Sequence, residues 1–278
     1  MPDRRAVGVV FDGGLAGLLT VVHAYYYDKL LPVELHEEAS FQSSLGTDYV
    51  HIATNEAKAE TVLEALRKKL SQDSVSNIFN AMLHESDERF MSIFQYIIAG
   101  FHYLSALDSY EQLDYVLAMH KMVRHVNSEA HLLKGFVRFT KTPDGVYYAD
   151  ISPKNEVLHV LAAHFAERLG GERWIIHDVR HKLAAVYDTK EWIIMEAPAQ
   201  AANPQRDDAD GYGALWSAFY DSIMIQERAN PKCRRSHMPK YFWKHMTEHK
   251  AVLDKYREEI GEPPRSAMLP ASTTVAAD

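Results

Sequence analysis

The spacing of apolar residues changes near Gly135, after a long helical stretch, and that change limits the fold more than any other feature. From Ser71 to Val126 apolar side chains recur every three or four residues, which predicts a layer of amphipathic helices. After Gly135 aromatic and β-branched residues gather in short runs, which predicts strands. The sequence therefore predicts an α+β protein with a mixed, mainly antiparallel sheet, a helical layer and a basic C-terminal helical element.

A β-hairpin is expected where the strands begin. Phe136–Thr140 and Val146–Ile151 have strand composition, and Thr142-Pro143-Asp144-Gly145 between them has the residues of a tight turn. A helix should then open at Ser152-Pro153 and end at Gly170-Gly171, because Pro suits a first helical turn and Gly suits a helix end. Three further strands are predicted at Trp174–Asp178, Leu183–Tyr187 and Trp192–Glu196.

The N-terminal segment has the pattern of a strand, a tight turn and a helix. Val7–Phe11 is a short apolar run, Asp12-Gly13-Gly14 supplies the turn, and apolar residues follow at helical spacing up to Tyr26. Such a turn can bind phosphate, but this one lacks the dinucleotide-binding fingerprint and a P-loop Lys, so the start of a packed helix is favoured. A polar loop is expected after Pro32, a strand at Tyr49–Ala53 and an amphipathic helix at Asn55–Leu70.

Length and composition bound the class of protein. The 278 residues, 47% hydrophobic and 24% charged, describe a globular chain and exclude a fibrous one. A single cysteine, Cys233, excludes an intramolecular disulfide. Neither a secretory leader nor an uninterrupted apolar span of about 18 residues is found, so a cytoplasmic protein is expected.

Four consecutive segments are expected along the chain. An α+β core domain covers 1–196, and a loop rich in Ala, Pro, Asn and Asp covers 197–213. A C-terminal helical element at 214–260, with helices near Tyr212–Ala229 and Pro239–Glu259, packs on the core, and 261–278 is a disordered tail.

The formal net charge of −8 is unevenly distributed. Met1–Met119 holds 8 basic and 17 acidic residues, whereas Arg228–Arg257 holds 9 basic and 2 acidic ones. Phosphate binding requires clustered Lys and Arg. The two parts therefore suit different partners, a protein for the acidic half and DNA for the basic segment.

The basic segment Arg228–His245 interleaves cations with aromatic side chains. Cations neutralise phosphates while aromatic faces stack on bases, so a nucleic-acid-binding surface is one interpretation. The other is a C-terminal helix whose aromatic residues belong to the core and whose cations are merely solvated. Under the first interpretation the binding residues are Arg228, Lys232, Arg234, Arg235, Lys240, Tyr241, Trp243 and Lys244, extended by Arg124, Lys134 and Arg138.

The densest polar cluster lies at the end of the predicted helical layer. On a helix His120, Arg124, Asn127 and His131 differ by three or four residues and share one face, which could bind an anion or hold a base. The alternative is a buried polar seam in which each imidazole meets a backbone carbonyl or a carboxylate. Both interpretations stay open at this point.

His177 and Asp178 end a predicted strand, a place from which side chains reach a cleft. Neighbours in a strand point to opposite faces, so a direct pair between the two is not expected. The alternative is a turn that begins at the Asp, with the His on the sheet surface. No Cys pair, His-Glu-x-x-His motif or Gly-x-Ser-x-Gly elbow occurs, so neither a metal site nor a cofactor nor a serine nucleophile is expected.

Several of these stretches occur together in a characteristic order. They are Phe11-Asp-Gly-Gly with Gly17-Leu-Leu; His120-Lys-x-Val-Arg124; Glu129-Ala-His131-x-x-Lys134-Gly-Phe-Val-Arg138-Phe139; Tyr147-Tyr-Ala-Asp150-Ile-x-Pro153; His164-Phe165-x-x-Arg168; Trp174-Ile-Ile-His177-Asp178; Tyr187-Asp with Trp192; Glu227-Arg228-x-Asn230-Pro; and Met238-Pro-Lys-x-x-Trp243. Over roughly Val9 to Glu248 the chain resembles a bacterial family assigned to DNA metabolism or DNA repair.

The resemblance implies work on DNA. Members of that family look like companions of a separately encoded radical S-adenosylmethionine (radical-SAM) protein, and some are joined to a uracil-DNA glycosylase-like domain. The first hypothesis is therefore a DNA-binding repair or modification factor that presents damaged or modified DNA to a radical-SAM partner. One departure stands out, because the family commonly has an Arg-Met pair where this chain has Leu132-Leu133.

Two other functions stay open from the sequence. One is a stand-alone hydrolase or glycosylase for DNA or nucleotides, with its acid and base drawn from His120, Glu129, His131, His177 and Asp178. The other is a non-catalytic scaffold whose acidic N-terminal half docks a partner protein.

Overall fold

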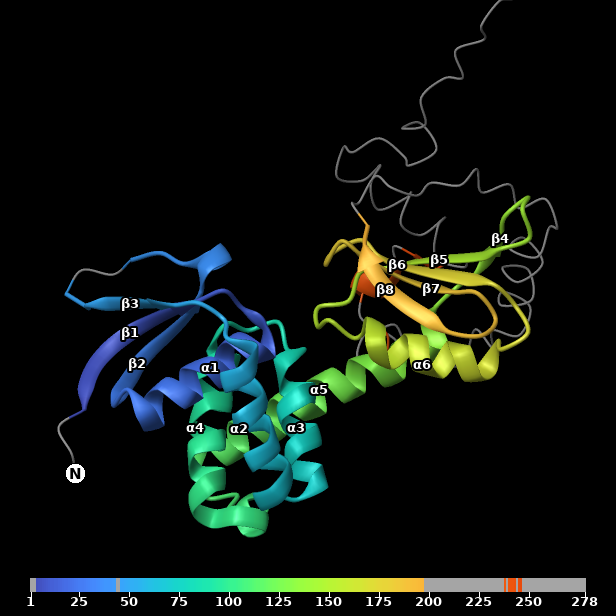
Figure 1. Cartoon of the computed structure of the whole chain (residues 1–278). Coiled ribbons are helices and arrows are strands. Elements are labelled where there is room, and N and C mark those ends of the chain that lie inside the picture. Colours follow the sequence, from blue (N-terminus) through green and yellow to red (C-terminus); the bar gives the residue numbers. More distant parts are fainter. Residues whose placement is uncertain (1–3, 44–45, 198–237, 239, 244, 247–278) are drawn as a thin grey trace, which may run out of the picture. The chain divides into compact units, whose positions relative to one another are not determined.

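The computed structural model describes residues 4–43, 46–197, 238, 240–243 and 245–246, and it confirms the predicted α+β class (Figure 1). The chain divides into two compact units, unit 1 (Met1–Glu129 with Lys154–Val157) and unit 2 (Ala130–Pro153 with Leu158–Asp278). The predicted tail, nearly all of the predicted loop at 197–213, the predicted helix at Tyr212–Ala229 and most of that at Pro239–Glu259 lie outside the described residues. The expected core domain at 1–196 stays a prediction.

Unit 1 contains a parallel sheet. Its strands are β1 (Arg5–Phe11), β2 (Leu30–Glu37) and β3 (Tyr49–Ile52), in the order β2-β1-β3. The helix α1 (Gly14–Tyr27) connects β1 to β2, and the short 3-10 helix η1 (Glu38–Ser40) follows β2. The predicted strands at Val7–Phe11 and Tyr49–Ala53 are confirmed.

The predicted polar loop after Pro32 is wrong, because that segment is the strand β2. β2 lies at the edge of the sheet, where Pro is tolerated since its missing N–H leaves no inner ladder bond unmade. The pairing register also shifts between Val7 and Gly8, which makes a bulge opposite them in β2. The bulge lets both Pro32 and Leu35 be buried, and it hides the alternation that identifies a strand.

The predicted turn after β1 is confirmed. Gly13 and Gly14 have φ values of 104° and 67°, in the left-handed region that favours glycine. A Cβ on Gly13 would also overlap the Glu37 side chain. The turn therefore requires glycine for both backbone and packing reasons.

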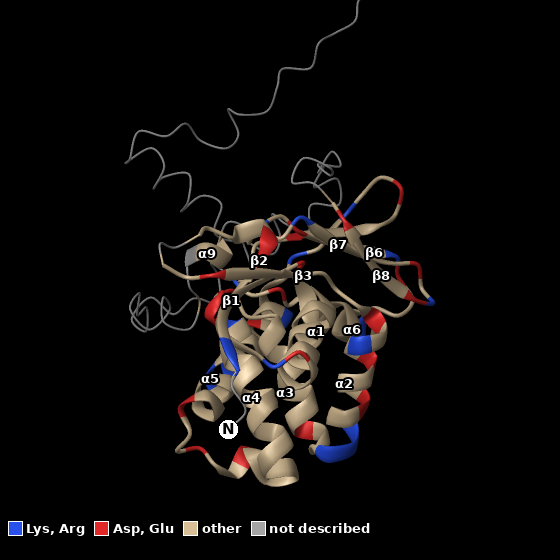
Figure 2. Cartoon of the chain, turned by 60° about the vertical axis from the view of Figure 1, so that its left-hand side comes forward, with Lys and Arg blue, Asp and Glu red and all other residues tan. Residues whose placement is uncertain are grey.

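The predicted helical layer is confirmed in unit 1. Asn55 caps the helix after β3, as its Oδ1 accepts the N–H of Lys58 at 3.0 Å. Basic residues end the same helix, blue in Figure 2, where they face the negative end of the helix dipole. The helices are α2 (Glu56–Lys69), α3 (Gln72–Met82), α4 (Glu88–Tyr103), the 3-10 helix η2 (Leu104–Ser109) and α5 (Asp114–Phe136).

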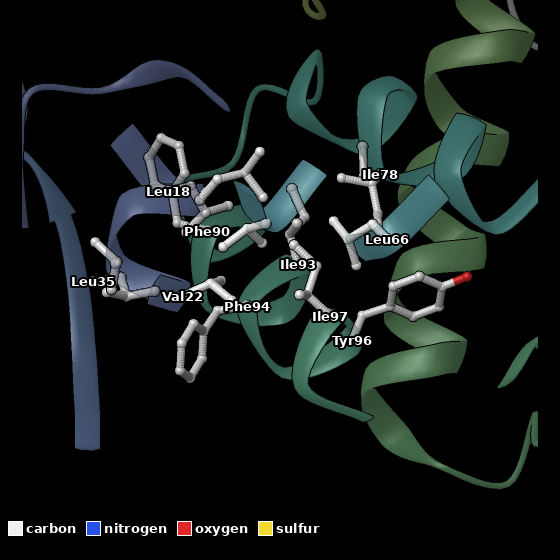
Figure 3. Close-up of a cluster of buried hydrophobic side chains, with 14 of the residues drawn as sticks. Leu18, Val22, Leu35, Leu66, Ile78, Phe90, Ile93, Phe94, Tyr96 and Ile97 are labelled. Atoms are coloured by element: carbon white, nitrogen blue, oxygen red, sulfur yellow. The ribbon is translucent and has the colours of Figure 1, made fainter. Parts of the chain in front are cut away.

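The core of unit 1 lies between the sheet and these helices. Leu18 and Val22 of α1, Leu35 of β2 and Phe90 and Ile93 of α4 are among its buried side chains (Figure 3). Burying each such side chain stabilises the fold by about 1.5–3 kcal/mol relative to leaving it exposed. The core therefore joins the strands β1 and β2 with α1 and with the helices from α2 to α5.

One helical stretch, Glu88–Ser109, is long and apolar enough to cross a membrane. Its most apolar window is 44% buried inside the chain. Phe90, Ile93 and Ile97 of this stretch all belong to the core of unit 1. The stretch is therefore compatible with a soluble protein.

Unit 2 contains a five-stranded sheet in the order β4-β5-β6-β7-β8. The strand β5 (Tyr147–Ile151) runs parallel to β6 (Trp174–Asp178), with the helix α6 (Leu158–Arg168) between them in sequence. The remaining neighbours pair antiparallel, so the sheet is mixed and mainly antiparallel, as predicted. β6, β7 (Leu183–Tyr187) and β8 (Trp192–Glu196) have the predicted bounds.

The predicted hairpin is present with a shorter first strand. β4 holds only Thr140–Lys141, paired with Tyr148 and Tyr147 of β5. The predicted strand at Phe136–Thr140 is wrong over most of its length, because α5 continues to Phe136. The buried stripe of α5 extends through Leu133, whose carbonyl still accepts the N–H of Val137 at 2.9 Å, so the helical period persists past the predicted boundary.

The predicted helix start at Ser152-Pro153 is also wrong, since α6 begins at Leu158. The backbone N–H groups of Lys154 and Asn155 each donate to the Glu129 carboxylate at 2.8 Å. Side-chain acceptors that take backbone donors in this way compete with helix formation. The segment before α6 is therefore not helical, and Lys154 and Asn155 lie in a bend.

Candidate functional site

Tyr148, Asp150 and His177 form a buried polar centre on one face of the unit 2 sheet. Asp150 of β5 lies opposite His177 of β6, and Tyr148 shares the face of Asp150 two residues earlier. The Tyr148 hydroxyl donates to Asp150 Oδ1 at 2.9 Å and lies 2.9 Å from His177 Nδ1. His177 Nδ1 lies 3.3 Å from Asp150 Oδ1, and the His177 residue is 1% exposed.

The second ring nitrogen of His177, Nε2, shows which nitrogen carries hydrogen. Nε2 lies 3.3 Å from the carbonyl oxygen of Ala197, which only accepts, so Nε2 carries a hydrogen. The Tyr148 hydroxyl has one hydrogen, and Asp150 Oδ1 and His177 Nδ1 are both within its reach. The three side chains therefore satisfy one another's polar groups inside the sheet, as burial requires.

Asp178 serves a separate purpose on the other face of β6. Its side chain is 0% exposed, and its Oδ1 accepts the N–H groups of Arg180 and His181 at 3.1 and 3.2 Å. Its Oδ2 lies 2.6 Å from Nδ1 of His181. His177 and Asp178 therefore do not pair with each other, as strand geometry predicts, and Asp178 begins a turn.

Glu129 lies on the buried stripe of α5 and anchors the segment Lys154–Val157. Beyond the two backbone bonds described above, its Oε2 accepts from Asn155 Nδ2 at 2.7 Å. Asn155 Oδ1 in turn accepts the N–H of Glu85 at 3.0 Å. The Glu129 carboxylate is thus a structural acceptor in unit 1, while His131, two residues later, is exposed.

The predicted polar face of α5 divides into two environments. Arg124, Asn127 and His131 are exposed, whereas His120 is half-buried and its Nε2 lies 3.0 Å from Asp108 Oδ1. The structure thus places a carboxylate beside the one predicted imidazole that faces inward. The contact of His120 agrees with the predicted polar seam. The other three side chains are exposed, so the seam does not extend to them.

Asp108 gathers further donors around that contact. The hydroxyls of Ser74 and Tyr96 donate to it at 2.6 and 2.5 Å. Burial by itself raises the pKa of Asp108, but the bonds from Ser74, Tyr96 and His120 outweigh it and hold that pKa below its ordinary value. Burial, together with the carboxylate, raises the pKa of Tyr96 above its ordinary range, and Figure 3 shows its hydroxyl directed away from the apolar cluster.

Lys134 at the end of α5 and His164 and Arg168 of α6 form a cationic cluster in unit 2. Burial, then the positive charges of Lys134 and Arg168, lower the pKa of His164 below its ordinary value, while Glu167 opposes them. Neither Lys134 nor Arg168 has an ion pair within the described part of the chain. Lys134 and Arg168 thus both act on His164, and neither has an ion-pair partner among the described residues.

Arg138 follows the cluster along the chain and closes the end of α5. Its Nη1 donates to the carbonyl of Gly135 at 2.8 Å and to that of Val137 at 3.4 Å. Part of its guanidinium therefore satisfies backbone acceptors that a helix end leaves over.

The described part of the C-terminal element packs into unit 2. In α9 (Lys240–Trp243) the side chain of Phe242 is buried. Its ring centroid lies 5.6 Å from that of Phe136 and 4.2 Å from that of Tyr241. Trp243 Nε1 donates to the Met238 carbonyl at 3.0 Å. These contacts favour the interpretation in which the aromatic residues belong to the core. The predicted cations Arg228, Lys232, Arg234, Arg235 and Lys244, and the side chain of Lys240, lie outside the described residues.

Sequence reasoning missed Tyr148, Asp108, His181 and a contact of 2.8 Å between Ser152 Oγ and His245 Nε2. The alternation of Tyr148 and Asp150 along one strand was a readable signal for a shared face, and so was the spacing of Asp178 and His181 for a turn. Within the described ranges, no three His, Cys, Asp or Glu residues gather as a metal site would require.

A family model for a domain of unknown function, DUF4130, matches residues 87–248, more than half of the chain. The matched region begins just before α4 and includes the polar centre and the cationic cluster. No curated protein and no solved structure matches the chain.

Proposed function

The chain belongs to the DUF4130 family of unknown function, and from its own side chains we propose that it binds DNA through the cationic cluster of unit 2. The observation that carries this proposal is the convergence of Lys134, His164 and Arg168 from two helices. Cations held together without paired carboxylates repel one another, so a partner of opposite charge stabilises them. A phosphate backbone is such a partner.

The surroundings of the cluster support the same partner. Arg168 is exposed, and Lys134 is half-buried with its long aliphatic stem available to pack while its ammonium reaches water. The Phe139 ring lies 5.1 Å from that of Phe165, the neighbour of His164. Phe165 is buried, so the partly exposed Phe139 ring is the one that can offer a stacking face to a base, which a small anion such as free phosphate would not use.

The resemblance to DNA metabolism and repair proteins extends this proposal. In that reading the chain holds damaged or modified DNA while a separately encoded radical-SAM protein carries out the reaction, in the cytoplasm. The cations of the cluster position the DNA, and the buried centre of Tyr148, Asp150 and His177 stabilises the unit 2 sheet. No side chain of that buried centre touches the substrate in this mechanism.

The DNA proposal is tested by salt-dependent binding of fluorescent oligonucleotides. Replacing Lys134 or Arg168 by Ala should weaken all sequences alike and flatten the plot of log affinity against log salt by about one unit each. Lys121→Ala is the matched control, because Lys121 is exposed on α5 outside the cluster. Affinity and slope that stay unchanged in both cluster variants contradict the placement.

The partner is tested separately with lesion-bearing oligonucleotides. The purified chain alone should give no turnover, and adding the radical-SAM protein should produce it. Turnover by the chain alone, abolished by His131→Ala or His177→Ala with DNA affinity intact, would instead establish the stand-alone hydrolase or glycosylase.

A further inference from the structure

Among the described residues of unit 1, the helices pack against one face of its parallel sheet (Figure 1). Val7, Val9 and Phe11 of β1 point into the core, so the residues between them point to the opposite face. Figure 1 shows the helices of unit 1 gathered on one side of this sheet. The opposite side presents a group of polar and aromatic side chains that we call the ring face: Glu34, His36, Phe41, Tyr49 and His51.

The rings of this face are packed into a fixed arrangement. Phe41 lies in the middle, with ring centroids 4.8 Å from Tyr49, 5.7 Å from His36 and 6.1 Å from His51. Gly8 of β1 makes the arrangement possible, because a Cβ there would overlap the Tyr49 ring. The aromatic surface is therefore formed before any partner arrives.

Glu34 gives the ring face a negative centre. Its Oε2 accepts from the Tyr49 hydroxyl at 2.7 Å and lies 3.2 Å from His36 Nε2. Hydrogen bonds from Tyr49 and then His36 lower the pKa of Glu34, so the carboxylate stays charged. The side chain is 39% exposed, and its Oε1 has no hydrogen bond within the described part of the chain.

Acidic residues outnumber cations around this face. Between Leu30 and Ile52 the sequence carries no Lys or Arg, and its acidic residues are Glu34, Glu37, Glu38 and Asp48. Glu37 lies on the core side with its strand neighbour Phe11 and pairs with Arg89 at 3.9 Å, and the exposed Asp48 pairs with Arg5 at 3.7 Å, so Glu34 is the carboxylate that the ring face itself presents. Negative charge of this kind repels phosphate and attracts a cation.

We propose that the ring face binds an arginine-bearing segment of a partner protein. A guanidinium stacks on aromatic faces and donates hydrogen bonds to carboxylates, and this face offers both within one packed group. The surface lies outside the matched region 87–248 and does not depend on the DNA proposal. The ring face requires a positively charged partner. That charge is absent from a polyanion, from an uncharged proline-rich peptide and from a purely apolar partner.

The full chain is titrated with a hexa-arginine peptide by calorimetry and by backbone NMR. Glu34→Gln should weaken binding about tenfold, because it removes a charged acceptor, and Phe41→Leu should weaken it about two- to fivefold, because it removes the ring. Glu60→Gln and Phe79→Leu are matched controls in unit 1, since both residues are exposed on helices. Chemical shifts should move at Gly8, Phe41 and Tyr49.

Other outcomes contradict the proposal. Equal losses in Glu34→Gln and Glu60→Gln mean that net charge alone attracts the peptide. Tighter binding of a proline-rich peptide than of hexa-arginine shows a different occupant, and tighter oligonucleotide binding in Glu34→Gln shows a polyanion at this face. Circular dichroism checks that each variant is folded. If Phe41→Leu fails to fold, the result of Glu34→Gln, which conserves side-chain shape, tests the proposal alone.

Discussion

Glu129 and Asn155 are joined by two hydrogen bonds, from the backbone N–H and the side-chain amide of Asn155 to the same carboxylate oxygen, at 2.8 and 2.7 Å. The other oxygen accepts the N–H of Lys154. Three donors around one buried carboxylate hold the segment Lys154–Val157 in unit 1. The residue that sequence patterns offered as an acid or base thus organises the backbone.

Replacing Glu129 with Gln should lower the free energy of unfolding by about 2–3 kcal/mol, because the Gln amide turns a donor toward backbone donors and leaves buried groups unsatisfied. Urea unfolding followed by circular dichroism measures the change. Glu60→Gln is the control, since Glu60 is exposed and its ion pair with Arg67 is 3.8 Å long. A loss at Glu129 no larger than at Glu60 contradicts the anchoring role.

Tyr148→Phe isolates the hydroxyl of the polar centre. Asp150 and His177 lose the group that they share, so the free energy of unfolding should fall by about 1–2 kcal/mol while the buried ring stays packed. Thermal unfolding of this variant is compared with that of Tyr27→Phe, whose side chain is 69% exposed. Equal midpoints for the two variants would mean that the hydroxyl contributes nothing to the fold.

Regular patterns made the sheet of unit 2 predictable. β6, β7 and β8 follow short runs of strand-forming residues bounded by turns, and their ends agree with the sequence prediction. β2 could not be found in the same way, because Pro32 and the bulge shift its buried residues by one position. The start of α6 was predicted wrongly for another reason. It depends on the hydrogen bonds of the preceding segment to Glu129, which lies far away in the sequence.

The same contrast between local patterns and tertiary contacts applies to the candidate site. The position of Glu129 among buried Val126, Ala130 and Leu133 is visible in the helical spacing, so a buried carboxylate was readable. The convergence of Lys134 with His164 and Arg168 was not, because it arises from the packing of two helices about thirty residues apart in the sequence. Local patterns place a side chain on a face, and tertiary contacts decide what meets it.

His84 should make the stability of the fold depend on pH. Burial, and then the positive charge of His125, lower the pKa of His84 below the ordinary value of about 6.5, with Arg89 acting in the same direction and Glu85 and Glu129 opposing. The folded state therefore binds this proton more weakly than the unfolded chain does. Stability is fully present above pH about 6.5 and is lost as pH falls through the lowered pKa.

Urea unfolding at pH values between 7.5 and 5 measures this loss, and its slope from one proton is at most about 1.4 kcal/mol per pH unit. His84→Asn should flatten the curve. His131→Asn, at an exposed position, should leave it unchanged. An identical pH dependence in wild type and His84→Asn contradicts the assignment.

His164 should make DNA binding depend on pH in the opposite direction. Its pKa is lowered by burial, Lys134 and Arg168, so the ring is neutral at pH 8 and gains its charge only below the ordinary histidine pKa of about 6.5. Protonation adds a cation to the cluster, and affinity should rise as pH falls, with the salt slope steeper by up to about one unit. Fluorescence polarisation should show this in wild type and in His159→Asn, an exposed control on α6, but not in His164→Asn.

Leu132 offers a gain-of-function test of the DNA surface. It is half-buried on α5 two residues before Lys134, where the resemblance seen in the sequence leads us to expect Arg, while Leu133 is buried in the core. An Arg at 132 can lay its aliphatic stem along the helix and extend its guanidinium into water. Leu132→Arg should therefore tighten DNA binding and steepen the salt slope by about one unit. Leu132→Gln controls for lost apolar surface, and the prediction is contradicted if Gln raises the slope as much as Arg, or if Arg leaves it unchanged.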